Sequence, residues 1–178
     1  MAPVNLFDAS ITQFINSCKS LKAILQKAKA HSPTEEYATL RLIEDMLPLS
    51  FQVQTVSNTI KKALERIVPQ KAPYPVWEDK ESTLDELIAR VDKTLALLET
   101  ITKEDLADKD SEVVEMKLGP RGTATAEIKG YVFGYSLPNV YFHTTATYAI
   151  LRAKGVPVGK MDFLTSYLEN NLLTPPTL

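Results

Sequence analysis

Apolar residues recur at alternating spacings of three and four along much of the chain, which is the period of an amphipathic helix. The first stripe predicts a helix from about residue 5 to residue 30, the second covers residues 49 to 67, and the third predicts a helix that ends near residue 101. The stripes consist of Phe7, Ile11, Phe14, Cys18, Leu21, Leu25 and Ala28, then Leu49, Val53, Val56, Ile60, Leu64 and Ile67, then Leu84, Ile88, Val91, Leu95 and Leu98.

Capping signals predict that a helix begins well before the second stripe. Ser32 suits the N-cap, Pro33 suits the first helical position, and Glu35 completes a capping box. We therefore expect a helix from this point to Met46. Pro48 lacks a backbone donor, so it should kink that helix or restart it ahead of the second stripe. For the third helix, Ser82 and Asp85 form a capping arrangement.

Two stretches interrupt the helical period. Residues 68–80 contain three prolines, which predicts an irregular crossover loop because proline cannot donate a backbone hydrogen bond. Between residues 111 and 130 the apolar period changes to two, around the turn residues Gly119-Pro120-Arg121-Gly122. This second stretch predicts a small β-hairpin.

The last long helix is expected to open at residues 136–138 and to end at Gly155. Phe142, Ala146, Ala149 and Ala153 share one face of it, and these mostly small side chains predict close packing against neighbouring helices. A short helix should cover residues 162–169, and residues 170–178 should form a tail. The predicted fold is all-α: one domain, residues 1–178, forming an antiparallel four-helix bundle with the hairpin at 111–130 inserted before the last long helix.

Composition excludes several classes of function. The 178 residues carry 20 Lys and Arg against 22 Asp and Glu, so there is no basic excess to bind nucleic acid. The six glycines form no phosphate-binding loop, and no apolar run is long enough to span a membrane. Because the sequence has a single cysteine and no secretory pattern at its start, a cytoplasmic location is expected.

Metal-binding residue types are scarce. Cys18, His31 and His143 are the only cysteine and histidines, and they are too widely separated in sequence to complete a zinc site. We therefore expect no bound transition metal and no other cofactor.

Residues 137–163, LPNVYFHTTATYAILRAKGVPVGKMDF, closely resemble the C-terminal signature of the domain of unknown function 1993 family. Residues 41–54, RLIEDMLPLSFQVQ, match a second family segment, and residues 82–98 around Arg90 match a third, weaker one. That family resembles a branch of the DinB/YfiT-like four-helix bundles, many of which hold a divalent metal with three histidines from different helices. The resemblance implies the fold but not the metal site, because only His143 stands on a bundle helix in a family motif.

His143 is the leading candidate for acid–base chemistry, with Asp45 as the residue that would orient it. Gln52 lies beside the second stripe, where its amide can orient a ligand or tie two helices together. We expect the His143 ring to point into the bundle and to hydrogen-bond to Asp45 or Gln52. The competing interpretation for all three is structural: a buried neutral histidine, a carboxylate at a helix start, and an amide linking two helices.

Further candidate ligand contacts lie on the same helix as His143 and in the proline-rich loop. Tyr141, Tyr148 and Arg152 follow spacings of seven and four, so a phenol and a guanidinium would share one wall. Tyr141 is also a candidate catalytic group, and Trp77 is a candidate pocket lid or a cover for one end of the bundle.

Two functions remain open from the sequence. The first is a small-molecule site between the second and fourth helices, used for binding or for metal-free proton transfer of the isomerase or cyclase type. The second is a non-catalytic structural or interaction protein that forms a homodimer. A closed cavity of about 300 Å³ or more that touches His143 would favour the first.

Overall fold

The computed structural model describes residues 4–32, 36–117 and 119–171. Its α-helices are α1 (Leu6–Ala9), α2 (Ile11–His31), α3 (Leu49–Ile67), α4 (Leu84–Leu98), α5 (Ile128–Tyr131), α6 (Leu137–Ala153) and α7 (Lys160–Asn171). The strands are β1 (Val113–Lys117) and β2 (Thr123–Glu127). Short 3₁₀ turns occur at Tyr37–Thr39, Pro69–Lys71, Glu104–Leu106 and Gly119–Arg121, and a π-helical turn at Val132–Ser136 joins α5 to α6. The predicted tail from residue 172 onward lies outside the described residues.

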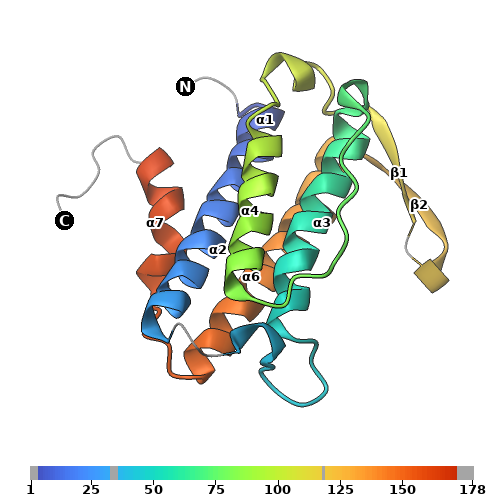
Figure 1. Ribbon diagram of the computed structural model, residues 1–178. Helices are drawn as coiled ribbons and strands as arrows, with labels where there is room; N and C mark the ends of the chain where they lie inside the picture. Colours follow the sequence, from blue (N-terminus) through green and yellow to red (C-terminus); the bar gives the residue numbers. More distant parts are fainter. Residues whose placement is uncertain (1–3, 33–35, 118, 172–178) are drawn as a thin grey trace.

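The helices α2, α3, α4 and α6 form the predicted four-helix bundle (Figure 1). The helix pairs α2–α4 and α3–α6 run antiparallel. The crossover loop between α3 and α4 returns along the length of the bundle, so α3 and α4 run in the same direction (Figure 1). The helix α7 packs on the outside of α2. Among the described residues, no helix has both the length and the apolar character needed to cross a bilayer.

The first two stripes form helices because their apolar faces reach the core. In α2 the side chains of Phe14, Leu21 and Leu25 are completely buried, as are Val53 and Ile60 in α3. Burying such side chains is the main stabilising term in a bundle of this size. The first predicted helix is divided in two at Ser10, whose hydroxyl donates to the Leu6 carbonyl oxygen at 2.6 Å.

The helix expected before Pro48 does not form in the described residues, and this prediction was wrong. Of the predicted capping signals, Pro33 and Glu35 lie outside the described residues. A single 3₁₀ turn at Tyr37–Thr39 is followed by an irregular segment up to Pro48, after which α3 begins. In that segment the apolar side chains of Leu42 and Ile43 remain exposed, so a helix there would gain no core contacts.

The start of α4 is capped one residue later than the sequence pattern indicates. Thr83 is the N-cap, its hydroxyl accepts from the Glu86 backbone N–H, and the Glu86 side chain accepts from the Thr83 N–H. The Glu86 carboxylate also accepts from the Ser82 N–H at 2.7 Å. These hydrogen bonds lower the pKa of Glu86, which favours the charged form that caps the helix.

The buried face of α6 is not the small-residue face that the sequence predicts. Of the predicted face only Ala146 is buried, at 7% exposed, whereas Phe142 is 62% exposed and Ala153 is exposed. The other buried residues of α6 are Leu137, Val140, Thr144, Thr147, Ile150 and Leu151. The aliphatic face buries more apolar area than an alanine face would. The two threonines tolerate burial because each hydroxyl donates to the backbone carbonyl four residues earlier.

The hairpin forms where the period-two pattern predicts it. Its strands pair antiparallel, with Val113 opposite Glu127 and Lys117 opposite Thr123. Gly119 and Gly122 have positive φ angles of 61° and 84° in the connection, a conformation that glycine adopts without the cost of a Cβ clash.

We expect the hairpin to open locally more often than the helices do. Two-stranded ribbons are marginally stable unless one face is covered, and within β1 only Val114 is buried. Amide hydrogen exchange should therefore be faster over residues 113–127 than in the centre of α6. Exchange at equal rates in the two segments would contradict this expectation.

Candidate active site

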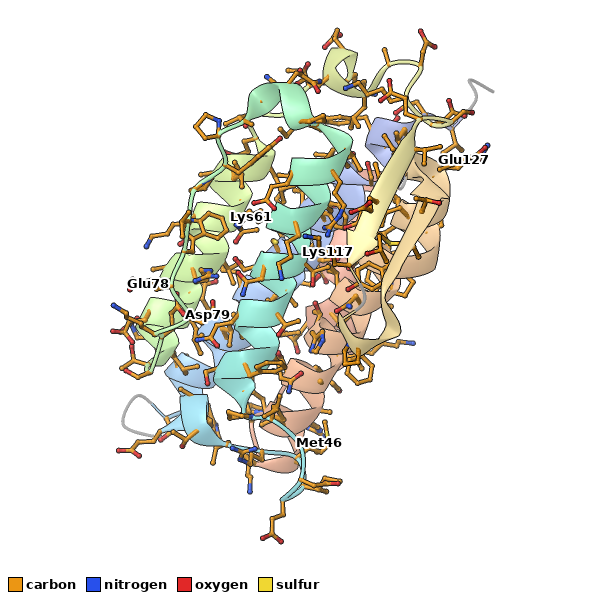
Figure 2. The ribbon with its side chains drawn as sticks, turned by 90° about the vertical axis from the view of Figure 1, so that its right-hand side faces the viewer. Met46, Lys61, Glu78, Asp79, Lys117 and Glu127 are labelled. Atoms are coloured by element: carbon orange, nitrogen blue, oxygen red, sulfur yellow. The ribbon has the colours of Figure 1, made fainter. Side chains whose placement is uncertain are left out.

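A groove of about 540 Å³ lies between α3, the hairpin and the segment from α5 to α6. Figure 2 shows this side of the molecule, with α3 facing the viewer and Lys117 between α3 and the hairpin. The groove extends along α3 from Phe51 to Arg66, and α6 contributes Asn139 and His143 to its wall. Its volume is within the range of small-molecule pockets, about 300–1,000 Å³.

His143 is held in a defined orientation by Gln52. Gln52 is 3% exposed, and its Nε2 donates to the Leu47 backbone oxygen at 2.9 Å. This contact directs Oε1 toward the imidazole, where it lies 2.7 Å from His143 Nδ1. Because Oε1 can only accept, Nδ1 carries the proton and Nε2 of the neutral ring keeps its lone pair. No described residue hydrogen-bonds to Nε2.

The surroundings of the imidazole favour its neutral form. Phe51 and Phe142 contact the ring edge-on, with centroid distances of 6.1 Å and 5.1 Å. Partial burial lowers the pKa of His143 below the usual 6.5. The side chain is therefore a neutral hydrogen-bond acceptor at physiological pH.

We expect the protonation of His143 to change both its imidazole NMR signals and the free energy of unfolding. The folded pKa lies below the unfolded value, so the unfolded chain binds more protons between the two. The contribution of His143 to stability is complete above about pH 6.5 and is lost as the pH falls through the folded pKa. An NMR titration of the imidazole C–H signals, assigned with His143→Gln, should give a midpoint below 6.5. A midpoint at or above that value would show that the ring is not desolvated.

Stacked aromatic rings form the other end of the groove. Tyr131 and Tyr135 are stacked with centroids 5.7 Å apart, and the Arg66 guanidinium lies over Tyr131 at 5.5 Å. Both tyrosines sit at the junction of α5 and the π-helical turn, where the Leu137 N–H donates to the Val132 oxygen five residues earlier. Such π turns recur at functional sites because the extra residue changes the direction of the side chains.

Arg90, which is 2% exposed, hydrogen-bonds to two residues of the groove lining, Asn58 and Asp79. Its guanidinium donates to Ser57 Oγ, Asn58 Oδ1, the Glu78 backbone oxygen, Asp79 Oδ1 and Glu81 Oε1, at 2.7–3.0 Å. The Trp77 ring covers the guanidinium at 5.0 Å. These contacts fasten the crossover loop to α3 and α4. Figure 2 labels Glu78 and Asp79 in this loop.

The structure brings together two of the residues that the sequence singled out, His143 and Gln52. Asp45 is exposed in the irregular segment before α3 and does not line the groove. The Trp77 ring packs on Arg90 and does not line the groove. Asp45 therefore lies on the surface and Trp77 lies against Arg90, and neither side chain lines the groove.

The other predicted contacts on α6 do not face this groove. The Tyr141 ring contacts Tyr167 edge-on at 6.2 Å, and burial raises the pKa of Tyr141. Tyr148 borders a separate shallow depression formed with α7, and Arg152 is exposed. A different phenol and guanidinium, which were not singled out from the sequence, meet in the groove: Arg66 Nη1 lies 3.3 Å from Tyr131 Oη.

A family model described as "Domain of unknown function (DUF1993)" matches residues 6–164. The chain belongs to this family. A crystal structure of a DinB family member protein from Shewanella denitrificans is 33% identical to the DUF1993 chain. The match covers 89% of this chain and 91% of that chain, with a TM-score of 0.79. No curated protein matches the chain. The predicted DinB-like bundle is confirmed.

The donor set of the DUF1993 groove does not suit the three-histidine metal site of many DinB-like bundles. His143 is the only imidazole in its lining, and the Thr147 hydroxyl, one turn along α6, donates to the His143 backbone oxygen. Over the described part of the chain, no group of three or more His, Cys, Asp or Glu side chains is placed to bind a metal ion.

Several groove residues were not singled out from the sequence. Asn139 lies within the family segment 137–163, four residues before His143, so the helical spacing could have predicted that the two side chains share one face. Lys117 comes from the hairpin and meets α3 only through the tertiary fold. Arg66 and Tyr131 are likewise brought together only by packing.

Proposed function

We propose that the groove of this DUF1993 protein binds a small molecule and that His143 accepts a proton from it. The observation that carries the proposal is the fixed tautomer: Gln52 engages Nδ1, which leaves the Nε2 lone pair for a ligand in the groove. A general base needs a partner that orients it and a pKa that keeps it unprotonated. Gln52 and the partial burial of the ring supply these two conditions.

The chemistry that fits this arrangement is proton transfer within one substrate, as in an isomerisation or a cyclisation. His143 Nε2 takes a proton from an acidic C–H or O–H group, and the imidazolium returns it to another atom of the same molecule. No electrons leave the substrate, so the step requires no redox partner. Gln52 acts as a positioning residue because its Oε1 continues to accept from Nδ1 while the ring is charged.

The direct test is retention of metabolites by the purified protein. Thr55 lines the groove and is half-buried, so Thr55→Trp should fill part of the space. Lys93→Trp, at an exposed position of α4, is the matched control. A compound retained by the wild type and by Lys93→Trp, but lost from Thr55→Trp, would support the proposal. Equal retention by all three folded proteins, or retention by none, would contradict it.

The second candidate function is self-association as a homodimer. Phe142 is 62% exposed on α6 and lines a shallow hollow of about 430 Å³ together with Leu42, Ala146 and Ala149. A knob and a hollow on one helix face complement each other about a two-fold axis, so the ring of one copy fits the hollow of the other.

We expect Phe142→Lys to shift the protein toward the monomer in light-scattering measurements across a concentration series. Phe133→Lys is the matched control, because Phe133 is 56% exposed but does not line the hollow. A wild-type protein that stays monomeric at all concentrations would exclude this candidate.

A further inference from the structure

The groove has the opposite charge sign to the protein as a whole. The chain carries a formal net charge of −2, yet three of the four charged residues in the groove lining are cationic: Lys62, Arg66 and Lys117. The fourth, Asp79, is already engaged, since its carboxylate accepts from Arg90 Nη2 at 3.0 Å and from Asn58 Nδ2 at 2.9 Å. The lining therefore carries a net positive formal charge.

No carboxylate of the described residues forms an ion pair with the cations of the groove. Arg66 donates to the backbone oxygens of Lys62 and Glu115 and to the Tyr131 hydroxyl, all of which are uncharged acceptors. Lys62 and Lys117 are exposed and form no ion pair within the part of the chain that the structure describes. Figure 2 shows Lys117 between α3 and the hairpin, on the groove side of the molecule.

The His143 end of the groove presents hydrogen-bond acceptors. The Oδ1 atom of Asn139 is buried and has no hydrogen-bond partner among the described residues. His143 Nε2 is a second acceptor without a described partner. An unpaired acceptor gains a hydrogen bond from a donor that enters the site, and a hydroxyl is the simplest donor that can also give up a proton.

We propose that the ligand is a small organic anion with a carboxylate or phosphate at one end and a hydroxyl group at the other. The anion lies among Lys62, Arg66 and Lys117, and the hydroxyl donates to His143 Nε2 or Asn139 Oδ1. The face of Tyr135, stacked on Tyr131, gives the body of the molecule an apolar wall. This inference rests on the proposed function and names its substrate class.

The test uses four compounds of similar shape: para-hydroxybenzoate, its neutral amide para-hydroxybenzamide, the cationic para-hydroxybenzylamine, and benzoate, which lacks the hydroxyl. Binding is followed by NMR shifts of groove residues, including the imidazole signals of His143. We expect para-hydroxybenzoate to bind about tenfold more tightly than the amide and the amine, and more tightly than benzoate. Its affinity should fall as salt is added, because added ions screen the exposed lysines.

Lysine variants test whether the binding of para-hydroxybenzoate depends on the cations that line the groove. The double variant Lys62→Gln/Lys117→Gln should weaken para-hydroxybenzoate binding about tenfold, with the melting temperature unchanged, because both side chains are exposed. Lys61→Gln is the control: Lys61 is also on α3, but it pairs with Glu65 and does not line the groove.

Each negative result in the compound series contradicts a different part of the inference. If the amide or amine binds in the groove as tightly as the acid, the anionic class is wrong and the small-molecule site stands. If benzoate equals para-hydroxybenzoate, the hydroxyl is wrong. If no compound of the series shifts groove signals, this inference is overturned, and the proposed function is then decided by the metabolite-retention experiment with Thr55→Trp.

Discussion

Replacing Arg90 with alanine is expected to destabilise the protein by about 3–5 kcal/mol, the cost typical of removing one partner from a buried charged network. Asn58 and Ser57 would lose a donor, the Glu81 carboxylate would remain largely buried without its cation, and Trp77 would lose the guanidinium that it covers. For a chain of this length the melting temperature should fall by roughly 10 °C.

Urea unfolding followed by circular dichroism measures the Arg90 effect. Arg152→Ala is the control, since Arg152 is exposed and a surface substitution should change stability by no more than about 0.5 kcal/mol. Arg90→Lys should give an intermediate loss, because an ammonium group has fewer donors than the fork-shaped guanidinium. A loss for Arg90→Ala as small as that for Arg152→Ala would show that the crossover loop is held by other contacts.

Replacing Gln52 with leucine is expected to cost about 2 kcal/mol, because it leaves the Leu47 oxygen and His143 Nδ1 without their partner. Leucine has a similar volume, so the loss measures hydrogen bonding more than packing. The same substitution should release the imidazole tautomer. Nitrogen-15 NMR should then show protonation of Nε2 in a substantial fraction of molecules, where the wild type has it on Nδ1.

The control for Gln52 is Gln26→Leu, the same substitution at an exposed position of α2. It should leave both the free energy of unfolding and the tautomer unchanged. An imidazole already protonated at Nε2 in the wild type would contradict the geometry on which the proposed proton acceptor rests.

The hydrophobic period predicted the bundle well, because long apolar stripes leave few alternatives to helices that pack on one another. The helix expected ahead of Pro48 rested on capping signals, which are local and carry no information on whether a core is available to bury the helix. Leu42 and Ile43 stay exposed there. The hydrophobic period misassigned the buried face of α6, because the choice between the alanine face and the Val140–Ile150 face depends on the competing neighbours.

The candidate site was predictable only in part. The sequence predicted that His143 hydrogen-bonds to Asp45 or Gln52, because a polar side chain that points inward needs a hydrogen-bond partner. In the structure the partner is Gln52. The positive charge of the groove was not predictable from any local pattern. Lys117 belongs to the hairpin, and its position beside Lys62 and Arg66 is set by tertiary packing.

The π-helical turn at Val132–Ser136 has a consequence for how relatives of this protein diverge. The turn holds one residue more than an α-helical turn. The side chains before it therefore point about 100° away from where they would point if α5 and α6 formed one continuous α-helix. A one-codon deletion in this stretch would leave α6 in the bundle while turning Tyr131 away from the groove. Family members of different length at this point are therefore expected to share the scaffold and to differ in what they recognise.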